Sequence, residues 1–138
     1  MDDDELIDAL AQTAFAVMAA LNRVGAEYDL SLTQLRVLGI LRDRRMRISE
    51  LAEYLGLEKS TITGLVDRAE KRGLLTRAPN ATDGRAVDVF ITPAGEALAV
   101  PAYARLVELL APPLAALQPA ERRQLRQHLR TMLGPESV

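Results

Sequence analysis

The 138-residue sequence predicts a mostly α-helical fold with a small β-wing, namely a winged helix-turn-helix flanked by N- and C-terminal dimerisation helices. Three observations lead to this prediction. Apolar residues recur at spacings of three and four near both ends of the chain, as on one face of an amphipathic helix. Two short helical patterns meet at Gly56. Two strand-like runs joined by turn-forming residues follow them directly.

The N-terminal third is predicted to form two helices. Residues 5–26 place Leu6, Leu10 and Leu21 on one face of a long amphipathic helix. A second helix begins after Ser31, because Ser31 and Gln34 match a capping box, in which two side chains satisfy free amides at a helix start.

The central segment, residues 48–92, carries the clearest functional pattern. A short helix is expected over 48–55, and Gly56 ends it because glycine tolerates the left-handed conformation. The next helix spans residues 59–72. Its predicted buried stripe consists of Ile62, Leu65, Val66 and Ala69. Small polar and basic side chains on its other face suit a DNA groove.

Two strands are predicted at 74–78 and 86–92, and residues 79–85 between them contain the turn formers Pro, Asn, Asp and Gly. Such a hairpin is the wing of a winged helix-turn-helix. An arginine there can enter a narrow minor groove, where the negative potential is enhanced. Asp83 is expected to orient Arg85 through a bidentate pair.

The apolar faces of the two terminal helical regions must pack against something outside the winged helix-turn-helix. The winged helix-turn-helix is complete within residues 30–92, which leaves the apolar faces of 5–26 and 93–134. Pairing across a two-fold axis would cover them and double the contacts with a palindromic DNA site. We therefore expect dimerisation, with a monomer that carries a helical cap as the alternative. Pro101 is expected to kink or break the C-terminal helix.

Composition limits the classes of protein. The length fits one domain, residues 1–138. The absence of cysteine excludes disulfides, thiol redox sensing and cysteine zinc sites, and a single histidine, His128, makes a metal site unexpected. We expect no cofactor. No apolar run approaches the roughly 18 residues of a membrane span, and the acidic N-terminus is unlike a signal peptide, so a cytoplasmic protein without membrane contact is expected.

Charge is segregated along the chain although the net charge is only −2. Residues 1–41 carry a net charge of −5, residues 42–85 carry +3, and residues 86–138 are neutral. Positive charge therefore gathers in the predicted helix-turn-helix and wing, where the local field decides DNA binding. A merely solvated basic surface is the alternative.

Candidate DNA contacts lie on the second central helix and the wing. They are Lys59, Ser60, Thr61, Thr63, Gly64, Arg68, Arg77, Asp83 and Arg85. A cleft for a small ligand between the first two helices is a weaker hypothesis, because such residues are more often core or solvated. Its candidate lining is Phe15, Met18, Asn22, Tyr28 and Arg36.

The order of helices, the segment ELAEYLGLEKSTITGLVDRAEKRGLL and the wing APNATDGRAVDVFIT resemble the MarR family of bacterial transcriptional regulators. The resemblance runs from about Leu6 to Leu133 and is most specific at Asp83, Gly84 and Arg85, on which the aspartate–arginine wing pair of the family falls. It implies a homodimer joined through terminal helices that binds pseudo-palindromic double-stranded DNA, usually as a repressor. It also implies release by a small phenolic or anionic effector. Glu58 departs from the family, which usually has Ser, Asp or Thr at this N-cap.

Two other classes were weighed against a regulator. An enzyme is poorly supported, because the sequence shows no nucleophile–base pair, phosphate loop or metal cluster. A winged-helix protein-interaction module without DNA binding is the better alternative. The bases clustered on the second central helix and wing favour DNA.

Overall fold

The computed structural model describes residues 3–135. This part of the chain folds into six helices and three strands, with no cis peptide bond. Their order is α1 (Asp3–Tyr28), α2 (Leu32–Leu41), β1 (Met46–Arg47), α3 (Ile48–Leu55), α4 (Lys59–Lys71), β2 (Leu75–Pro79), β3 (Val87–Ile91), α5 (Pro93–Ala115) and α6 (Pro119–Leu133).

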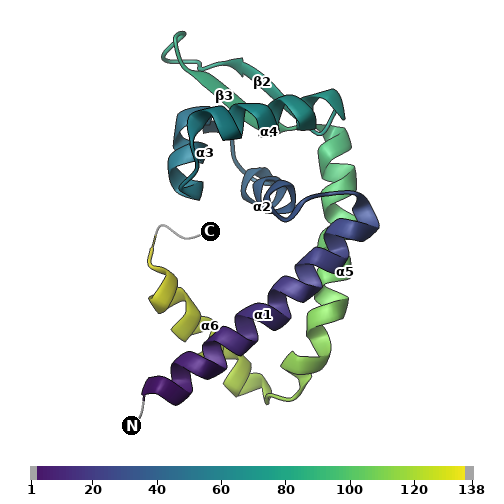
Figure 1. Ribbon diagram of the computed structural model, residues 1–138, viewed down its shortest axis with the longest axis vertical. Helices are drawn as coiled ribbons and strands as arrows, with labels where there is room; N and C mark the ends of the chain where they lie inside the picture. The colour runs from purple at the N-terminus through teal and green to yellow at the C-terminus, as the bar shows by residue number, and fades with distance from the viewer. Residues whose placement is uncertain (1–2, 136–138) are drawn as a thin grey trace.

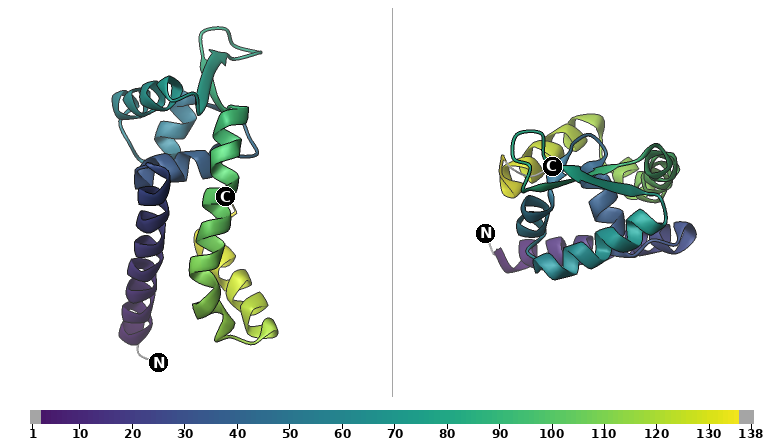
Figure 2. Two further views of the ribbon diagram at one scale, coloured as in Figure 1. Left: turned by 90° about the vertical axis from the view of Figure 1, so that its right-hand side faces the viewer. Right: turned by 90° about the horizontal axis from the view of Figure 1, so that it is seen from above.

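The molecule has two parts, which we call the head and the stalk. The head consists of α2, α3, α4 and the three strands, and the stalk consists of α1, α5 and α6 (Figure 1). The long helices α1 and α5 run away from the head and pack against each other. Helix α6 folds back beside the far end of α5 (Figure 2). The predicted fold class is confirmed.

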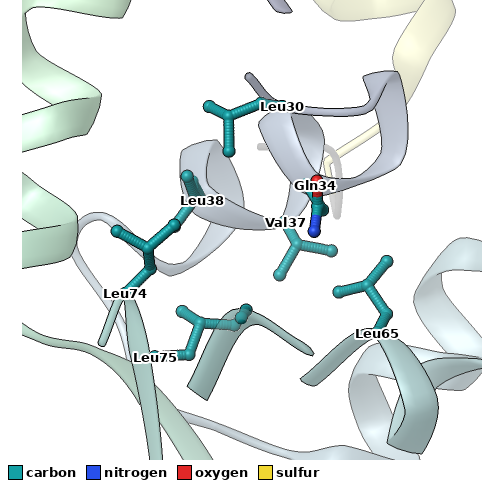
Figure 3. Close-up of a pocket in the computed structure, with 8 residues that line it drawn as sticks. Leu30, Gln34, Val37, Leu38, Leu65, Leu74 and Leu75 are labelled. Carbon is teal, nitrogen blue, oxygen red and sulfur yellow. The ribbon is translucent and has the colours of Figure 1, made fainter. Parts of the chain in front are cut away.

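The head has a closed apolar core. Leucine and valine side chains from α2, α4 and β2 converge below the sheet, and they leave no space for a water molecule between them (Figure 3). The predicted stripe of α4 is buried as expected. Fully buried members of this core include Val37, Leu51, Ile62, Val66 and Val89.

The sheet has three antiparallel strands in the order β1-β3-β2. Strands β2 and β3 form the predicted hairpin, with Leu75 opposite Ile91 and Pro79 opposite Val87. The two-residue strand β1 pairs Met46 with Val89 and was not predicted. So short a strand has no sequence period, because it is defined only by its pairing with β3.

Local signals fix the helix ends. The capping box of Ser31 and Gln34 is present, with bonds of 3.1 and 2.9 Å. Gly56 ends α3 with a positive φ of 66°. Thr92 caps α5 and donates to the Gly73 carbonyl. Gly95 is required at this joint between stalk and head, because a Cβ there would lie 2.2 Å from the Leu74 carbonyl oxygen.

Helix α5 departs from two expectations. It continues unbroken through Pro101, so of the predicted kink or break the break does not occur. Pro101 is exposed, so water can bond the carbonyl that loses its amide partner. Helix α5 is also long and apolar enough to cross a membrane by length and composition alone. It contains no uninterrupted apolar run of that length, because Glu96, Arg105 and Glu108 interrupt the apolar residues.

Candidate nucleic-acid interface

Helix α4 presents a polar face on the outside of the head. Lys59, Ser60 and Thr61 form its first turn and are exposed, while Ile62 behind them is buried. Glu58 takes the N-cap position without a side-chain hydrogen bond to the helix. Ser60 and Thr61 therefore lie at the N-terminal end of α4, exposed to solvent.

The middle of α4 is shaped by two internal contacts. The Thr63 hydroxyl donates to the Lys59 carbonyl at 2.8 Å. Arg68 lies over Gly64, with its Nη1 atom 3.4 Å from where a Gly64 Cβ would lie. A Cβ at this position would be in van der Waals contact with the Arg68 guanidinium.

A groove of about 520 Å³ lies between α4 and the wing. Four of the predicted DNA-contact residues line it, namely Lys59, Thr63, Arg77 and Arg85. Ser49 of α3 and Pro79 to the side complete part of its wall. The fold thus brings basic side chains that are 26 positions apart onto one concave surface.

Arg77 is partly exposed at the groove and is paired with two carboxylates of α4. Its Nη2 atom lies 2.6 Å from Asp67 Oδ1 and 3.0 Å from Glu70 Oε1, and its amide donates to Glu70 Oε2 at 3.0 Å. The hydrogen bond from Arg77 lowers the pKa of Glu70, and the same bond raises the pKa of Arg77. Sequence reasoning missed both acids, because their partner becomes visible only when β2 packs on α4.

The wing turn is organised by Asn80. Its Oδ1 atom accepts from the amides of Thr82 and Asp83, each at 3.0 Å. The predicted bidentate pair at the tip is wrong: a single Arg85 Nε to Asp83 Oδ1 contact spans 3.8 Å. The reason is that Asp83 Oδ1 already accepts the Arg85 amide at 3.1 Å. The Arg85 side chain is 98% exposed and extends freely from the wing.

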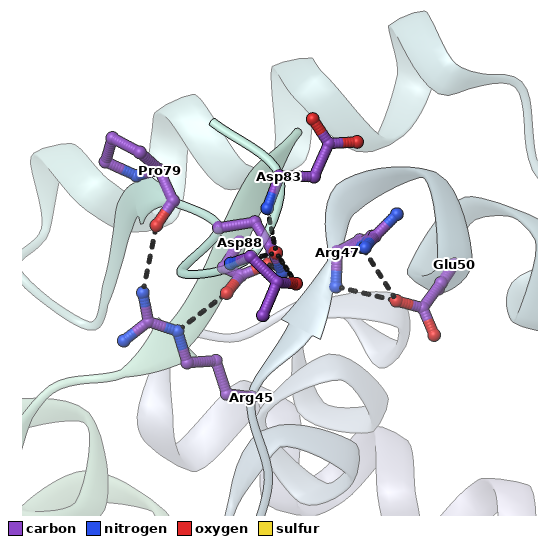
Figure 4. A network of polar contacts seen from close by, with 8 residues as sticks. Arg45, Arg47, Glu50, Pro79, Asp83 and Asp88 are labelled. Atoms are coloured by element: carbon purple, nitrogen blue, oxygen red, sulfur yellow. Dashed lines mark hydrogen bonds and ion pairs between the residues drawn. The ribbon is translucent and has the colours of Figure 1, made fainter. Parts of the chain in front are cut away.

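The base of the wing contains a buried acid that the sequence analysis did not single out. Asp88 on β3 accepts from Asn80 Nδ2 at 2.9 Å and from Arg45 Nε at 2.8 Å (Figure 4). The hydrogen bond from Asn80 has the largest effect on the pKa of Asp88 and lowers it. The hydrogen bond from Arg45 lowers the same pKa further. The Arg45 guanidinium also lies 4.5 Å from the centre of the Phe90 ring. The available signal was an acid inside an otherwise apolar strand.

The five candidate ligand-binding residues do not meet in one cavity. Phe15, Met18 and Asn22 are exposed on α1, while Tyr28 packs against the head core. Arg36 is exposed on α2, 5.9 Å from the centre of the Tyr54 ring. None of them lines the packed core space or the groove. Residues 3–135 also show no group of three acids or histidines placed to hold a metal ion.

Comparison with known proteins assigns the family. The MarR family pattern matches residues 28–86. The chain is 30% identical over 133 residues to the HTH-type transcriptional regulator PecS of Dickeya dadantii, covering 94% of this chain and 78% of PecS. The chain belongs to the MarR family. It spans a smaller share, 41%, of the regulator YfiV of Bacillus subtilis, to which 65 residues are 38% identical.

Solved structures of MarR-family regulators share the whole fold. A MarR-family regulator from Rhodococcus sp. RHA1 aligns over 100% of this chain and 99% of its own, with a TM-score of 0.82 and 24% identity. CouR from Rhodococcus jostii RHA1, bound to p-coumaroyl-CoA, aligns over 94% of this chain and 92% of its own, with a TM-score of 0.76 and 25% identity. The head and stalk together are therefore a MarR-family architecture.

Proposed function

We propose that this MarR-family chain is a homodimeric repressor that binds a pseudo-palindromic operator through α4 and the wing. The observation that carries the proposal is the groove, which lies between an exposed polar helix face and an exposed wing arginine. A helix in the major groove and a wing at the adjacent backbone or minor groove is the docking that such a surface permits.

Each surface residue has a distinct role in this proposal. Ser60 and Thr61 contact base edges, and Gly64 allows close approach of the backbone to DNA. Lys59, Thr63 and Arg68 bind phosphates. Arg85 enters the minor groove, and Asp83 fixes the turn that carries it. Arg77 acts differently from the sequence prediction: its pairing with Asp67 and Glu70 makes it the tie between wing and α4.

The dimer is supported by the stalk. In the described residues α6 has no buried side chain, and large apolar side chains are exposed on all three stalk helices. They include Ile7, Phe15, Val100, Tyr103, Met132 and Leu133. A second copy that covers this surface would also place two α4 helices on one duplex. A second copy that covers α5 would also explain why a helix of a cytoplasmic protein has so apolar a composition.

The proposal includes release by a small phenolic or anionic ligand. Its support is the similarity to CouR, a protein of known structure bound to p-coumaroyl-CoA. We test this part by adding p-coumarate, p-coumaroyl-CoA or acetate to a preformed operator complex. Release by either coumaroyl compound but not by acetate supports the effector, and no release by any of them rejects these ligands.

The DNA-binding proposal is tested by selection from a randomised duplex library with nonspecific competitor. We expect an enriched two-fold symmetric motif whose half-sites lie about 10 base pairs apart, or a multiple of that spacing. Binding should weaken steeply with salt, because phosphate contacts release counterions. No enriched motif and salt-insensitive binding would favour the protein-interaction module instead.

Substitution of Arg85 connects this binding to the wing. Arg85→Ala should weaken operator affinity by about 1–3 kcal/mol, as for other specific contacts. The matched control is Arg123→Ala, which removes the same charge from exposed α6 in the stalk. Equal affinities of the Arg85 variant and the wild type at physiological salt would contradict the proposed contact.

A further inference from the structure

Arg72, at the C-terminal end of α4, binds the end of α1. Its Nη1 atom donates to the Asp29 carbonyl at 2.6 Å, and its Nη2 atom donates to the Tyr28 carbonyl at 3.5 Å. Helix α4 otherwise packs mainly on α3 and β2, inside the head. The Arg72 side chain therefore links the DNA-facing helix directly to the stalk.

The acceptors of Arg72 are held in a rigid corner. Asp29 takes the left-handed conformation with a φ of 55°, and the Leu30 amide bonds back to the Gly25 carbonyl at 2.7 Å. A Cβ at Gly25 would lie 2.5 Å from the Leu30 carbonyl oxygen, so this close approach requires glycine. The last turn of α1 has no basic residue, and the Arg72 cation supplies the charge that a helix C-terminus favours.

The same corner is tied to α5 from the other side. Arg105 Nε lies 3.0 Å from Glu27 Oε2, and Arg105 Nη1 lies 3.0 Å from Glu108 Oε2. The hydrogen bond from Arg105 lowers the pKa of Glu27. Residues 27–29 are thus joined to α4 by one arginine and to α5 by another. Residues 27–29 are therefore held by α5, and Arg72 can orient α4 relative to them.

We propose that Arg72 is a positioning residue for DNA binding, which fixes the angle between α4 and α1. In the dimer of the proposed function, on which this inference rests, that angle sets the separation of the two α4 helices. Ser60 lies about 18 Å along the helix axis from Arg72, at about 1.5 Å per residue. A tilt of about 10° at Arg72 therefore moves Ser60 by about 3 Å, close to the rise of one base pair at about 3.4 Å.

A distance measurement within one chain tests the tie without DNA. The chain has no cysteine, so Ala26→Cys on α1 and Ser60→Cys on α4 accept two spin labels specifically. An excess of unlabelled chain keeps one labelled chain in each dimer. Arg72→Ala should shift or broaden the distance distribution by about 3 Å, and Arg72→Lys should restore part of it through one donor to Asp29. Arg68→Ala, the control one turn earlier, should leave it unchanged. An unchanged distribution in folded Arg72→Ala would overturn the proposal.

A binding measurement then tests the consequence on DNA. On a selected two-half-site operator, Arg72→Ala should lose about tenfold in affinity, because both α4 helices must match the spacing, while a single half-site should lose less than about twofold. Equal losses on both duplexes, with a salt slope reduced by about one, would show a phosphate contact instead and overturn the positioning role. A wild-type chain that binds no operator would reject the proposed function, while the distance measurement would still decide the role of Arg72.

Discussion

The head and the stalk bury their apolar side chains in opposite ways. In the head, Val37, Ile62 and Val89 are fully buried, and the core leaves no room for a water molecule. In the stalk, α6 buries no side chain, and Met132 and Leu133 are about two-thirds exposed, at 63% and 66%. The head buries its apolar side chains within a single chain, whereas the stalk leaves apolar side chains exposed, and the proposed second copy would cover them. Stability and assembly should therefore respond to substitutions in different parts of the molecule.

The largest expected effect is in the head core. Ile62→Ala removes a fully buried side chain from the inner face of α4. We expect a loss of about 2–5 kcal/mol in the free energy of unfolding, because the packed core cannot close the cavity. Urea denaturation at fixed protein concentration measures it. Thr61→Ala, next to it on the exposed face, should change this free energy by less than about 0.5 kcal/mol. Equal values for the two variants would contradict the closed core.

The stalk should show a smaller effect, and on assembly rather than on folding. Leu129→Glu places a charge in the exposed apolar stripe of α6. The dimer dissociation constant should rise by about 10- to 100-fold, which corresponds to about 1.5–3 kcal/mol for one buried leucine. Sedimentation equilibrium measures it. Gln124→Glu adds the same charge elsewhere on exposed α6 and serves as the control. A Leu129→Glu dimer as tight as the wild type would exclude α6 from the interface.

The smallest effect concerns the tie between wing and α4. Because Arg77 lowers the pKa of Glu70, the ion pair stabilises the fold above the ordinary glutamate pKa, and this contribution is lost as pH falls through the lowered value. Glu70→Gln should cost less than about 1 kcal/mol at pH 7. It should also lose less stability than the wild type between pH 7 and pH 3, measured by urea denaturation. Parallel losses in both proteins would show that Glu70 does not contribute to the acid dependence.

Periodicity in the sequence predicted the parts that depend on local patterns. The buried stripe of α4, the capping box at Ser31 and the β2–β3 hairpin follow from spacings within a few residues. These signals are local because one helix turn or one strand pair defines them. The helix that continues through Pro101 shows the limit of a local rule, since exposure of the proline makes the lost hydrogen bond tolerable.

Tertiary packing decided what the sequence could not show. Arg77 was expected at the DNA, yet Asp67 and Glu70 surround it once β2 lies on α4. Asp88 finds Arg45 across 43 positions of sequence, and Arg72 finds Asp29 across the same span. The partner of a charged side chain depends on which elements meet, and no periodicity encodes that choice. The proposed DNA contacts at the groove also depend on which elements meet in the fold.

Native mass spectrometry of the protein with its selected operator duplex tests the central claim most directly. The account predicts two chains per duplex, and a weaker complex, still with two chains, on a duplex in which one half-site is scrambled. A specific complex with one chain per intact operator would contradict the dimeric account of the stalk. The absence of any specific complex, with a folded head, would contradict the DNA-binding function itself.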